Sequence, residues 1–415
     1  MHILYFIPRY DPALMGNRIH AEVIHAWRAR GVTAEVISLD ASAPRLVSEE
    51  QEGIVAHRLP VSSDLPTKVA NRAADLLVRY PYLAGAVRHY RRFIRERRYD
   101  LVHIETAFPL GLVAALGQGS AGPPLAVTLP GADIMAEPEF DYGYGRHAAV
   151  RALLPLVFRR AAVIRADSPQ LKTLAVRLGA PPEKVTAIPY NITEDSYPPR
   201  SADLQALRAR SRAEVVARHN LDPERPIVVS LNRLHPFKGI VDLVEAVPHI
   251  QQAGVRPQVL IIGPSRSTPR FGDYGAYMQR RAEALGVADS VIFTGGVPHE
   301  QTLGYLAAAD AVVVPSVAES FSRVVVEAAA AGTPPIVTRT TGVSDYVAAA
   351  SCGLLVEPRS AESLGFALAR LLSDRVLWAG LAERCPPFAE QFRSEKIAHD
   401  LLDLYQQQVF SGRMS

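Results

Sequence analysis

The stretch that most constrains the fold of this chain runs from Ala311 to Gly332, with the sequence AVVVPSVAESFSRVVVEAAAAG. Residues 311–315 form an apolar run that ends in proline, which is typical of a strand buried on both faces of a parallel sheet. Small and polar residues follow over 317–322. The alanine-rich segment 323–331 then has strong helix propensity until Gly332 supplies the usual stop. The stretch therefore predicts a strand, a loop and a helix.

Two carboxylates fall within this predicted unit. Glu319 is expected on the loop at the carboxyl end of the strand, and Glu327 about one turn into the helix. Open α/β sheets bind ligands outside the carboxyl ends of their strands, where a helix N-terminus offers unpaired N–H groups and a positive dipole end. These features predict a site that suits a phosphate group. The alternative is that the eight-residue spacing is chance and that Glu327 is a solvated helix residue.

Length and composition indicate a globular protein of more than one domain. The chain has 415 residues, more than one hydrophobic core usually organises, so two domains are expected. Hydrophobic residues make up 48% and charged residues 21%, which is ordinary for a soluble protein. The formal charge of +3 is too small to indicate a nucleic-acid partner, and no RNA-binding or zinc-like motif accompanies it.

The amino terminus and the cysteines indicate a cytoplasmic protein that does not cross a membrane. The first residues, MHILYFIP, predict a buried strand rather than a signal peptide. The nearest candidate for a membrane span, residues 148–164, is interrupted by three arginines. Cys352 and Cys385 lack metal-site spacing, which favours a reducing compartment over a disulfide framework.

Alternating apolar runs and helical segments predict a first α/β domain. Strands are expected at 2–8, 32–39, 100–104, 125–129, 163–168 and 185–189, and helices at 18–30 and 69–98. Gly16 and Asn17 lie at the first strand-to-helix turn, where the backbone of such folds can come close to a ligand. Gly131 and Asp133 follow strand 125–129 in the same way.

A second α/β domain is expected after a linker over residues 193–200, which is rich in proline and polar residues. Its strands are expected at 226–231, 259–263, 291–296 and 311–315, with a helix at 240–253, a long loop at 264–277 and a final amphipathic helix at 388–410. Arg233 and Lys238 lie on the loop after strand 226–231. Because five-residue spacing lets both cations converge across a tight loop, they are candidates for binding a diphosphate.

Three of these segments resemble the family-4 glycosyltransferases. The string 315–332 resembles the family signature, in which a strand ending in Pro-Ser precedes Glu-x7-Glu and a helix that ends at glycine. Residues 232–239 resemble the family's Gly-Arg-Leu-x-x-x-Lys-Gly, with Asn232 in the first place. Residues 188–192 resemble the Ile-Pro-Asn-Gly-Val that ends the first domain. Weaker matches extend over nearly the whole chain.

The resemblance implies an α/β protein of the GT-B fold, in which two Rossmann-like, doubly wound parallel-sheet domains face a central cleft. The first, on the acceptor side, is expected over residues 1–195, and the second, which binds the nucleotide sugar, over residues 196–386. Residues 387–415 are expected to form a terminal helix that crosses back to the first domain.

The activity implied is that of a retaining glycosyltransferase. It would move a sugar from a nucleotide-diphosphate sugar, with UDP-sugars favoured over GDP-mannose, to an unknown hydroxyl acceptor in polysaccharide, glycolipid or glycosylated-metabolite synthesis. Breaking the anomeric C–O bond adds negative charge to the diphosphate, so catalysis requires fixed positive groups there. No cofactor or metal is expected, because Arg233, Lys238 and helix N–H groups replace one. The departing phosphate is expected to take the acceptor proton, with Glu319 as nucleophile a less favoured alternative.

The resemblance also assigns roles to individual residues. Arg233, Lys238 and Glu319 are the expected catalytic residues, and Glu327 the expected ligand of the ribose hydroxyls. The remaining donor-side candidates are Ser320, Phe321, Ser322, Arg323, Val324, Gly263 and Thr294, and the acceptor-side candidates are Gly16, Asn17, Gly131 and Asp133.

This chain departs from the family pattern at three positions. Many members carry His-Gly-x-Asp where this chain has Pro130-Gly-Ala-Asp, and a second common histidine is replaced by Glu105. Many also have a second glycine where this chain has Asn17. Pro130 cannot supply an imidazole, so any hydrogen bond or proton role of that histidine must come from elsewhere or be absent.

Other interpretations stay open. The basic segment Arg88–Arg98 is either a solvated helix face or, by analogy with surface-bound family members, a contact with anionic lipid at the inner face of the membrane. A noncatalytic nucleotide-sugar-binding subunit of a glycan assembly complex, or a nucleotide-sugar epimerase or hydrolase, would share the architecture. Diphosphate release with and without acceptor distinguishes these functions.

Overall fold

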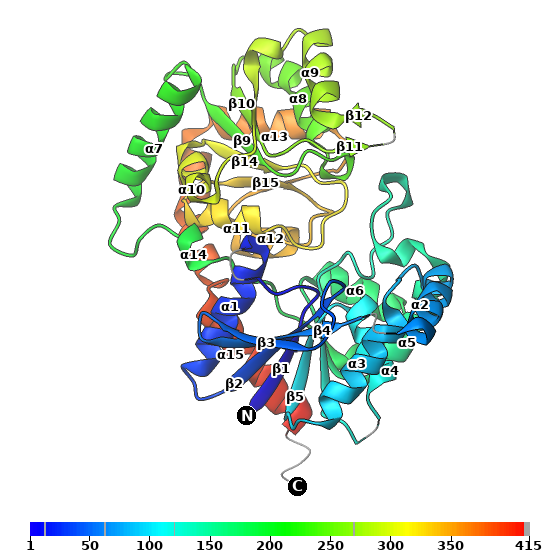
Figure 1. Ribbon diagram of the computed structural model, residues 1–415. Coiled ribbons are helices and arrows are strands. Elements are labelled where there is room, and N and C mark those ends of the chain that lie inside the picture. The colour runs from blue at the N-terminus through cyan, green and yellow to red at the C-terminus, as the bar shows by residue number, and fades with distance from the viewer. Residues whose placement is uncertain (12–13, 62–63, 120, 269, 411–415) are drawn as a thin grey trace. The chain divides into compact units, whose positions relative to one another are not determined.

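The computed structural model describes residues 1–11, 14–61, 64–119, 121–268 and 270–410. The predicted loop 264–277 includes residue 269, and the predicted terminal segment 387–415 includes residues 411–415, which lie outside the described residues. The chain divides into unit 1, residues 1–190 with 394–415, and unit 2, residues 191–393. Each unit is a sheet covered by helices (Figure 1). The units divide at 190/191 and 393/394, where the sequence predicted boundaries at 195/196 and 386/387.

The sheet of unit 1 has the strand order β3-β4-β2-β1-β5-β6-β7-β8 in the described part of the chain. Its strands are β1 (His2–Phe6), β2 (Thr33–Asp40), β3 (Val47–Gln51), β4 (Ile54–Pro60), β5 (Leu101–Glu105), β6 (Leu125–Leu129), β7 (Ala161–Ala166) and β8 (Val185–Ala187). All neighbouring strands are parallel except β3, which pairs antiparallel with β4. The order reverses between β1 and β5, so loops from both strands start at one switch point.

The β3–β4 hairpin is a feature that the sequence analysis did not predict. Glu52 and Gly53 connect the two strands with φ of 49° and 76°, the left-handed pair that a tight hairpin turn requires. Exposed Glu50 lies on β3, at the edge of the sheet. A charged edge strand discourages pairing with another chain.

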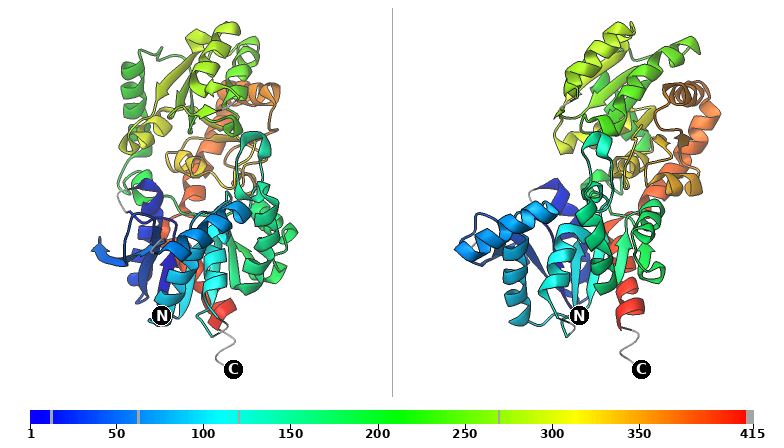
Figure 2. Two further views of the ribbon diagram at one scale, coloured as in Figure 1. Left: turned by 45° about the vertical axis from the view of Figure 1, so that its right-hand side comes forward. Right: turned by 90° about the vertical axis from the view of Figure 1, so that its right-hand side faces the viewer.

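Helices cover both faces of this sheet. They are α1 (Met15–Arg28), α2 (Leu65–Val78), α3 (Leu83–Arg95), α4 (Leu112–Gly117), α5 (Ala148–Arg160), α6 (Pro169–Arg177) and α15 (Ser394–Tyr405). Phe6 of β1 stacks on Tyr90 of α3 on one face, with ring centroids 5.4 Å apart. The prediction of one helix over 69–98 is wrong, because Arg79 adopts φ 57° and ends α2, and Pro81 precedes a separate α3. Helices α2 and α3 lie side by side (Figure 2).

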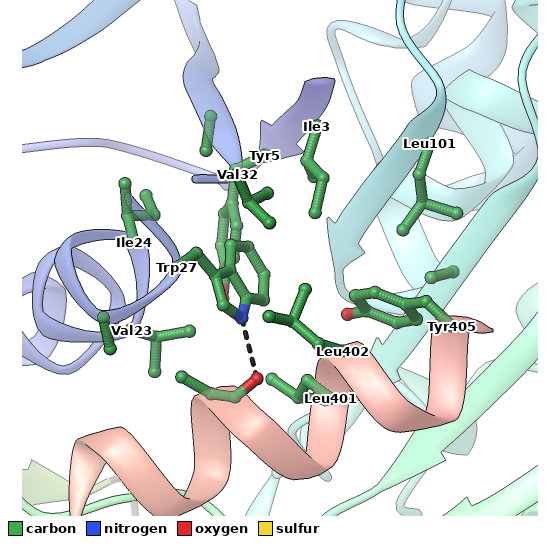
Figure 3. Close-up of a cluster of buried hydrophobic side chains, with 14 of the residues drawn as sticks. Ile3, Tyr5, Val23, Ile24, Trp27, Val32, Leu101, Leu401, Leu402 and Tyr405 are labelled. Atoms are coloured by element: carbon green, nitrogen blue, oxygen red, sulfur yellow. Dashed lines mark hydrogen bonds between the residues drawn. The ribbon is translucent and has the colours of Figure 1, made fainter. Parts of the chain in front are cut away.

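The last helix, α15, completes the core of unit 1. Leu401, Leu402 and Tyr405 are buried with residues of β1, β2, β5 and α1 (Figure 3). The indole Nε1 of Trp27 donates a hydrogen bond to Ala398 O at 2.9 Å. The prediction of one helix over 388–410 is wrong, because α14 (Arg375–Glu390) ends in unit 2 and α15 begins at Ser394.

The sheet of unit 2 is parallel throughout, in the order β13-β10-β9-β14-β15-β16. Its strands are β9 (Ile227–Leu231), β10 (Gln258–Ile262), β13 (Val291–Gly295), β14 (Ala311–Val314), β15 (Pro335–Thr338) and β16 (Leu354–Val356), with a separate hairpin of β11 (Ser267–Thr268) and β12 (Gly272–Asp273). Its helices are α7 (Leu204–His219), α8 (Ile240–Gln252), α9 (Tyr274–Ala284), α10 (His299–Ala308), α11 (Arg323–Ala330), α12 (Ser344–Ala350), α13 (Ala361–Ser373) and α14.

Both units therefore have the Rossmann-like α/β architecture that the sequence predicted. In unit 2 the order reverses between β9 and β14, since β10 and β13 extend to one side and β15 and β16 to the other. Ligands of such sheets bind outside the carboxyl ends of the strands at the reversal. The loops after β9 and β14 carry the predicted pairs Arg233/Lys238 and Glu319/Glu327.

Candidate active site

A pocket of about 410 Å³ opens at the switch point of unit 2. It is lined by Leu231, Asn232, Arg233, Lys238, Ile262, Gly263, Pro264, Gly296, Val297, Thr302, Glu319, Ser322, Arg323, Val324 and Glu327. These residues come from the ends of β9, β10 and β14 and the loops after them, from the segment after β13, from α10 and from α11. The structure thus brings together, in one unit, both pairs of charged residues that the sequence singled out.

The loops after β9 and β14 are joined along their length by close backbone contacts. Gly239 has φ 63°, and a Cβ there would lie 1.9 Å from Pro315 O, so only glycine fits. The N–H of Val317 donates to Phe237 O at 2.8 Å. Because these contacts lie on either side of Lys238, they place its side chain against the loop that carries Glu319.

The loop after β14 is also held from its other side by the segment after β15. The N–H of Gly342 donates to Glu319 O at 2.9 Å, and Thr340 Oγ1 donates to Ser316 O at 2.9 Å. The ring of Phe321 is 3% exposed and packs 5.6 Å from that of Phe392. Phe321 is therefore a core anchor that fixes the loop, and its side chain does not line the pocket.

Lys238 and Glu319 form an ion pair inside the pocket. Lys238 Nζ contacts Glu319 Oε2, and the two side chains are only 11% and 16% exposed. Ser316 Oγ donates to the same carboxylate oxygen at 3.4 Å. Arg233 is exposed at the same pocket and, among the described residues, has no carboxylate within ion-pair distance. The predicted cations thus differ, since one is neutralised by Glu319 and the other is not.

Further basic groups that the sequence analysis did not single out lie around these cations. Burial lowers the pKa of His235, and the positive charges of Arg233, Lys238 and Arg266 lower it further. Arg266 comes to this place because its N–H donates to Leu234 O at 3.2 Å, which ties the loop after β10 to the loop after β9. In the sequence, the position of Arg266 in the segment 264–277, which was predicted to be a long loop, was the only indication that this arginine could reach the pocket.

Glu327 lies in α11, near the helix start and on the pocket wall. Burial raises the pKa of its carboxyl, against the opposing influence of the charges of Arg323 and His299. The preceding Ser322 adopts φ 86°, and residues 322–324 line the pocket at the N-terminus of the helix. Backbone N–H groups at a helix start have no partner within the helix, so they suit an anion.

The other donor-side candidates divide between the pocket and its surroundings. Gly263 lines the pocket, and a Cβ on it would lie 1.8 Å from Asn232 O, so glycine keeps the ends of β9 and β10 close. Ser320 and Thr294 are not among the lining residues. Sequence analysis missed Thr302 and Val297, which line the pocket, and neither carries a sequence signal for that place.

In unit 1 the acceptor-side candidates follow the carboxyl ends of β1 and β6, with Gly16 and Asn17 in the first turn of α1 and Gly131 and Asp133 on the loop after β6. Asn17 Oδ1 accepts from Asp11 N–H at 2.9 Å and so closes the loop before α1, whose first turn contains exposed Gly16. Asp133 is 1% exposed and accepts from Ala107 N–H at 2.6 Å and from Gly131 N–H at 3.1 Å. Burial raises the pKa of Asp133 to about 7. Asp133 therefore ties the loop after β6 to the loop after β5.

Glu105, which replaces a common family histidine, is the centre of a buried polar cluster at the end of β5. Its carboxylate accepts from Tyr5 Oη at 2.6 Å and from Tyr190 Oη, and lies 2.9 Å from His103 Nε2. Burial alone would raise the pKa of Glu105, but the charge of His20 and the hydrogen bond from His103 hold it well below its usual range. The charged side chain of Glu105 thus has a structural role, since it holds these three side chains of unit 1 together.

Among the residues that the structure describes, no group of three or more His, Cys, Asp or Glu side chains is arranged to hold a metal ion. None of the helices in that part of the chain is both long and apolar enough to span a bilayer.

Comparisons with known proteins agree with this geometry. Residues 211–392 match the family described as glycosyl transferases group 1, and residues 16–191 match the glycosyl transferase 4-like domain. The D-inositol 3-phosphate glycosyltransferase of Nocardia farcinica is 30% identical over 336 residues, which are 80% of this chain and 66% of that protein, just under two thirds. A GDP-mannose-dependent alpha-(1-6)-phosphatidylinositol monomannoside mannosyltransferase of Mycobacterium tuberculosis is 27% identical over 89% of this chain and 85% of that protein.

The fold has a solved counterpart of similar extent. The structure of sucrose-phosphate synthase from Thermosynechococcus elongatus superposes with a TM-score of 0.76 over 99% of each chain, at 23% identity. The two matched family regions span residues 16–191 and 211–392, which include the sheet of unit 2, the pocket and every strand of the unit 1 sheet after β1. The chain belongs to the group 1, family-4-type glycosyltransferases, which have the GT-B fold and use nucleotide sugars.

Proposed function

We propose that this protein transfers a sugar, with retention of anomeric configuration, from a nucleotide-diphosphate sugar to a hydroxyl acceptor. The observation that carries the proposal is the convergence of Arg233, Lys238, Glu319 and the start of α11 on one pocket at the switch point of unit 2. Bond cleavage makes the diphosphate more negative. The barrier is lowered because preorganised cations and helix N–H groups bind the leaving diphosphate more strongly than they bind the intact donor.

The residues of the pocket divide this work between phosphate and sugar. Arg233, which has no carboxylate partner among the described residues, and Lys238 hold the leaving diphosphate, and the N–H groups at residues 322–324 add to them. Glu319 orients the donor-sugar hydroxyls and stabilises positive charge near the anomeric carbon. Glu327 accepts from the ribose hydroxyls. The departing phosphate takes the acceptor proton on the same face. These positive groups do the work of a metal, so none is required.

The acceptor is proposed from the relatives' names. Two of them act on inositol phosphates, one free and one as part of a lipid. We propose a phosphorylated polyol, free or lipid-linked, as the acceptor class. UDP-sugars and GDP-mannose are the donor classes to compare, since one relative is named for GDP-mannose.

Release of nucleoside diphosphate tests the activity. The protein is incubated with a panel of UDP- and GDP-sugars, with inositol phosphate, with phosphatidylinositol vesicles or without acceptor. Acceptor-dependent release supports transfer, release without acceptor indicates hydrolysis, and binding without release indicates a noncatalytic subunit. The anomeric configuration of the product by NMR tests retention, and unchanged rates in EDTA test metal independence.

Two variants test the assigned roles. Lys238→Ala should depress turnover by orders of magnitude, because it removes a cation from the leaving group. Glu327→Ala should mainly weaken nucleotide binding. Wild-type rates and affinities in both variants would refute these assignments.

A peripheral contact with anionic membrane at the cytoplasmic face is the remaining part of the proposal, and α2 is the surface that favours it. Leu65, Val69, Leu76 and Leu77 of this helix are 73%, 64%, 76% and 71% exposed. They face away from the buried side of the helix, which includes Asn71. Exposed Lys68 and Arg72 border the apolar side chains, and an apolar face bordered by basic residues suits an anionic lipid surface.

Two of the arginines of the segment 88–98 are engaged in hydrogen bonds within unit 1. Arg88 bonds Asp64 and Thr67, and Arg91 donates to the carbonyls of Leu116 and Gly117. The apolar face of α2 is therefore the sharper target for mutation.

Flotation with phosphatidylglycerol vesicles tests the contact. Wild-type protein should float with these vesicles, and the double change Leu76→Glu and Leu77→Glu should abolish this by placing charge on the apolar face. Val376→Glu is the matched control, because Val376 is 85% exposed on α14 of unit 2. Equal flotation of both variants, or of wild type with neutral phosphatidylcholine, would contradict the proposal.

A further inference from the structure

The ion pair between Lys238 and Glu319 means that one of the two cations assigned to phosphate binding is already paired within the protein. The Lys238 side chain is 11% exposed and that of Glu319 16% exposed, so water screens their attraction poorly. Ser316 Oγ, 3.4 Å from the same carboxylate oxygen, is a neutral neighbour that adds no charge. When a diphosphate enters the pocket, the ammonium group of Lys238 is therefore already in contact with the carboxylate of Glu319.

Glu319 and a diphosphate are competitors for Lys238. An ammonium group can donate to several oxygens, but a carboxylate and a diphosphate gathered at one ammonium repel each other. The loops cannot easily move apart to relieve this repulsion, because Gly239 lies against Pro315 O and Val317 N–H bonds Phe237 O. When Lys238 binds the phosphate, Glu319 therefore loses its cationic partner unless another hydrogen-bond donor takes the place of Lys238.

We infer that the Lys238–Glu319 pair is an exchange device by which the pocket distinguishes the nucleotide sugar from the nucleoside diphosphate left after transfer. The sugar of the donor carries hydroxyl groups that donate hydrogen bonds to Glu319 and so replace Lys238, which turns to the diphosphate. The product lacks those hydroxyls, so Glu319 has no replacement partner. The pair then re-forms and weakens the hold on the product, which favours its release. This inference rests on the proposed function, in which the donor's diphosphate and sugar occupy this pocket.

Arg233 provides the internal contrast. It lines the same pocket but has no carboxylate partner in the described part of the chain, so it binds a phosphate without any exchange. Removal of Arg233 should weaken the nucleoside diphosphate and the nucleotide sugar by similar factors. Removal of the Glu319 charge should affect them in opposite directions.

Calorimetric titration without acceptor tests the inference. The ligands are the better of UDP and GDP and the matching nucleotide sugar, and the readout is the ratio of their dissociation constants. In Glu319→Gln, which keeps the size of the side chain, we expect the nucleoside diphosphate to bind about 5- to 10-fold more tightly and the nucleotide sugar no more tightly than in wild type. The preference of the pocket for the nucleotide sugar, measured as the dissociation constant of the nucleoside diphosphate divided by that of the nucleotide sugar, should therefore fall by about fivefold or more. Arg233→Gln should leave this ratio within about twofold.

The outcomes separate this inference from the proposed function. If neither Glu319→Gln nor Glu319→Ala binds the nucleoside diphosphate more tightly than wild type, the exchange is wrong, although transfer by wild type would still stand. If wild type binds neither ligand, the proposed function fails and the inference with it. Glu319→Ala repeats the comparison without a side-chain amide, and thermal unfolding checks that each variant is folded. Tighter diphosphate binding in either folded variant supports the exchange, and its absence in both overturns it.

Discussion

Replacing Gly239 by alanine should disturb the contact that brings Lys238 to Glu319. The added Cβ would lie 1.9 Å from Pro315 O, whereas real Cβ contacts under 3.0 Å essentially never occur, so the carbonyl must move by about 1 Å. An alanine at the φ of 63° costs about 1–2 kcal/mol. Overpacking adds about 1–3 kcal/mol and a lost Phe237–Val317 hydrogen bond about 0.5–1.5 kcal/mol. We expect unit 2 to lose about 3–6 kcal/mol of unfolding free energy.

Gly286→Ala is the matched control for this change. Gly286 has φ 68°, and a Cβ on it would meet nothing within 4 Å, so it carries the same backbone cost without the clash. Its expected cost is about 1–2 kcal/mol. The chain has two tryptophans, Trp27 in unit 1 and Trp378 in unit 2. In a Trp27→Phe background, urea unfolding followed by fluorescence therefore reports on unit 2 alone, through an indole that donates to Asp310 O at 2.7 Å.

Nucleoside diphosphate affinity is the second readout for the same pair of variants. Because the clash displaces the loop that carries Lys238 from the other phosphate-binding groups of the pocket, Gly239→Ala should bind UDP or GDP at least about tenfold more weakly than Gly286→Ala, which should bind like wild type. Equal stability and equal affinity in the two alanine variants would show that the close approach at Pro315 is not what positions Lys238.

Three further predictions concern residues outside the charged pair. Because burial raises the pKa of Asp133 to about 7, the folded carboxyl keeps its proton where the unfolded one has lost it. Raising the pH from about 4 to 7 should therefore lower the unfolding free energy of unit 1 by about 1.4 kcal/mol per pH unit, and Asp133→Asn should remove this slope in urea titrations. Phe321→Ala should cost unit 2 about 3–5 kcal/mol in urea unfolding, since the ring is 3% exposed. Trp27→Phe should cost unit 1 about 1 kcal/mol and raise amide exchange in α15, because Ala398 O loses its partner.

Sequence patterns predicted the fold class because burial in a parallel sheet leaves a strong signal, and the observed sheets confirm it. The errors arose where one local residue overrules a longer pattern. Arg79 in a left-handed conformation and the nearby Pro81 divide the segment 69–98, which was predicted to be one helix, between two helices. The residues 52–53 form a hairpin turn that was not recognised, since Glu-Gly is a weaker turn signal than Asn-Gly.

For the candidate site, the sequence predicted which residues lie on the loops but not which of them touch. Lys238 and Glu319 are 81 positions apart, and neither spacing nor propensity places an ammonium against a carboxylate over that separation. Gly239 was identified only as the last residue of a motif, whereas the structure requires glycine there because Pro315 O lies against it on the loop after β14. A motif therefore specifies the charges of a site, while the backbone contacts that no motif contains determine which charges neutralise each other. For this pocket that difference decides whether a cation is ready for phosphate, as Arg233 is, or must first exchange its partner, as Lys238 must.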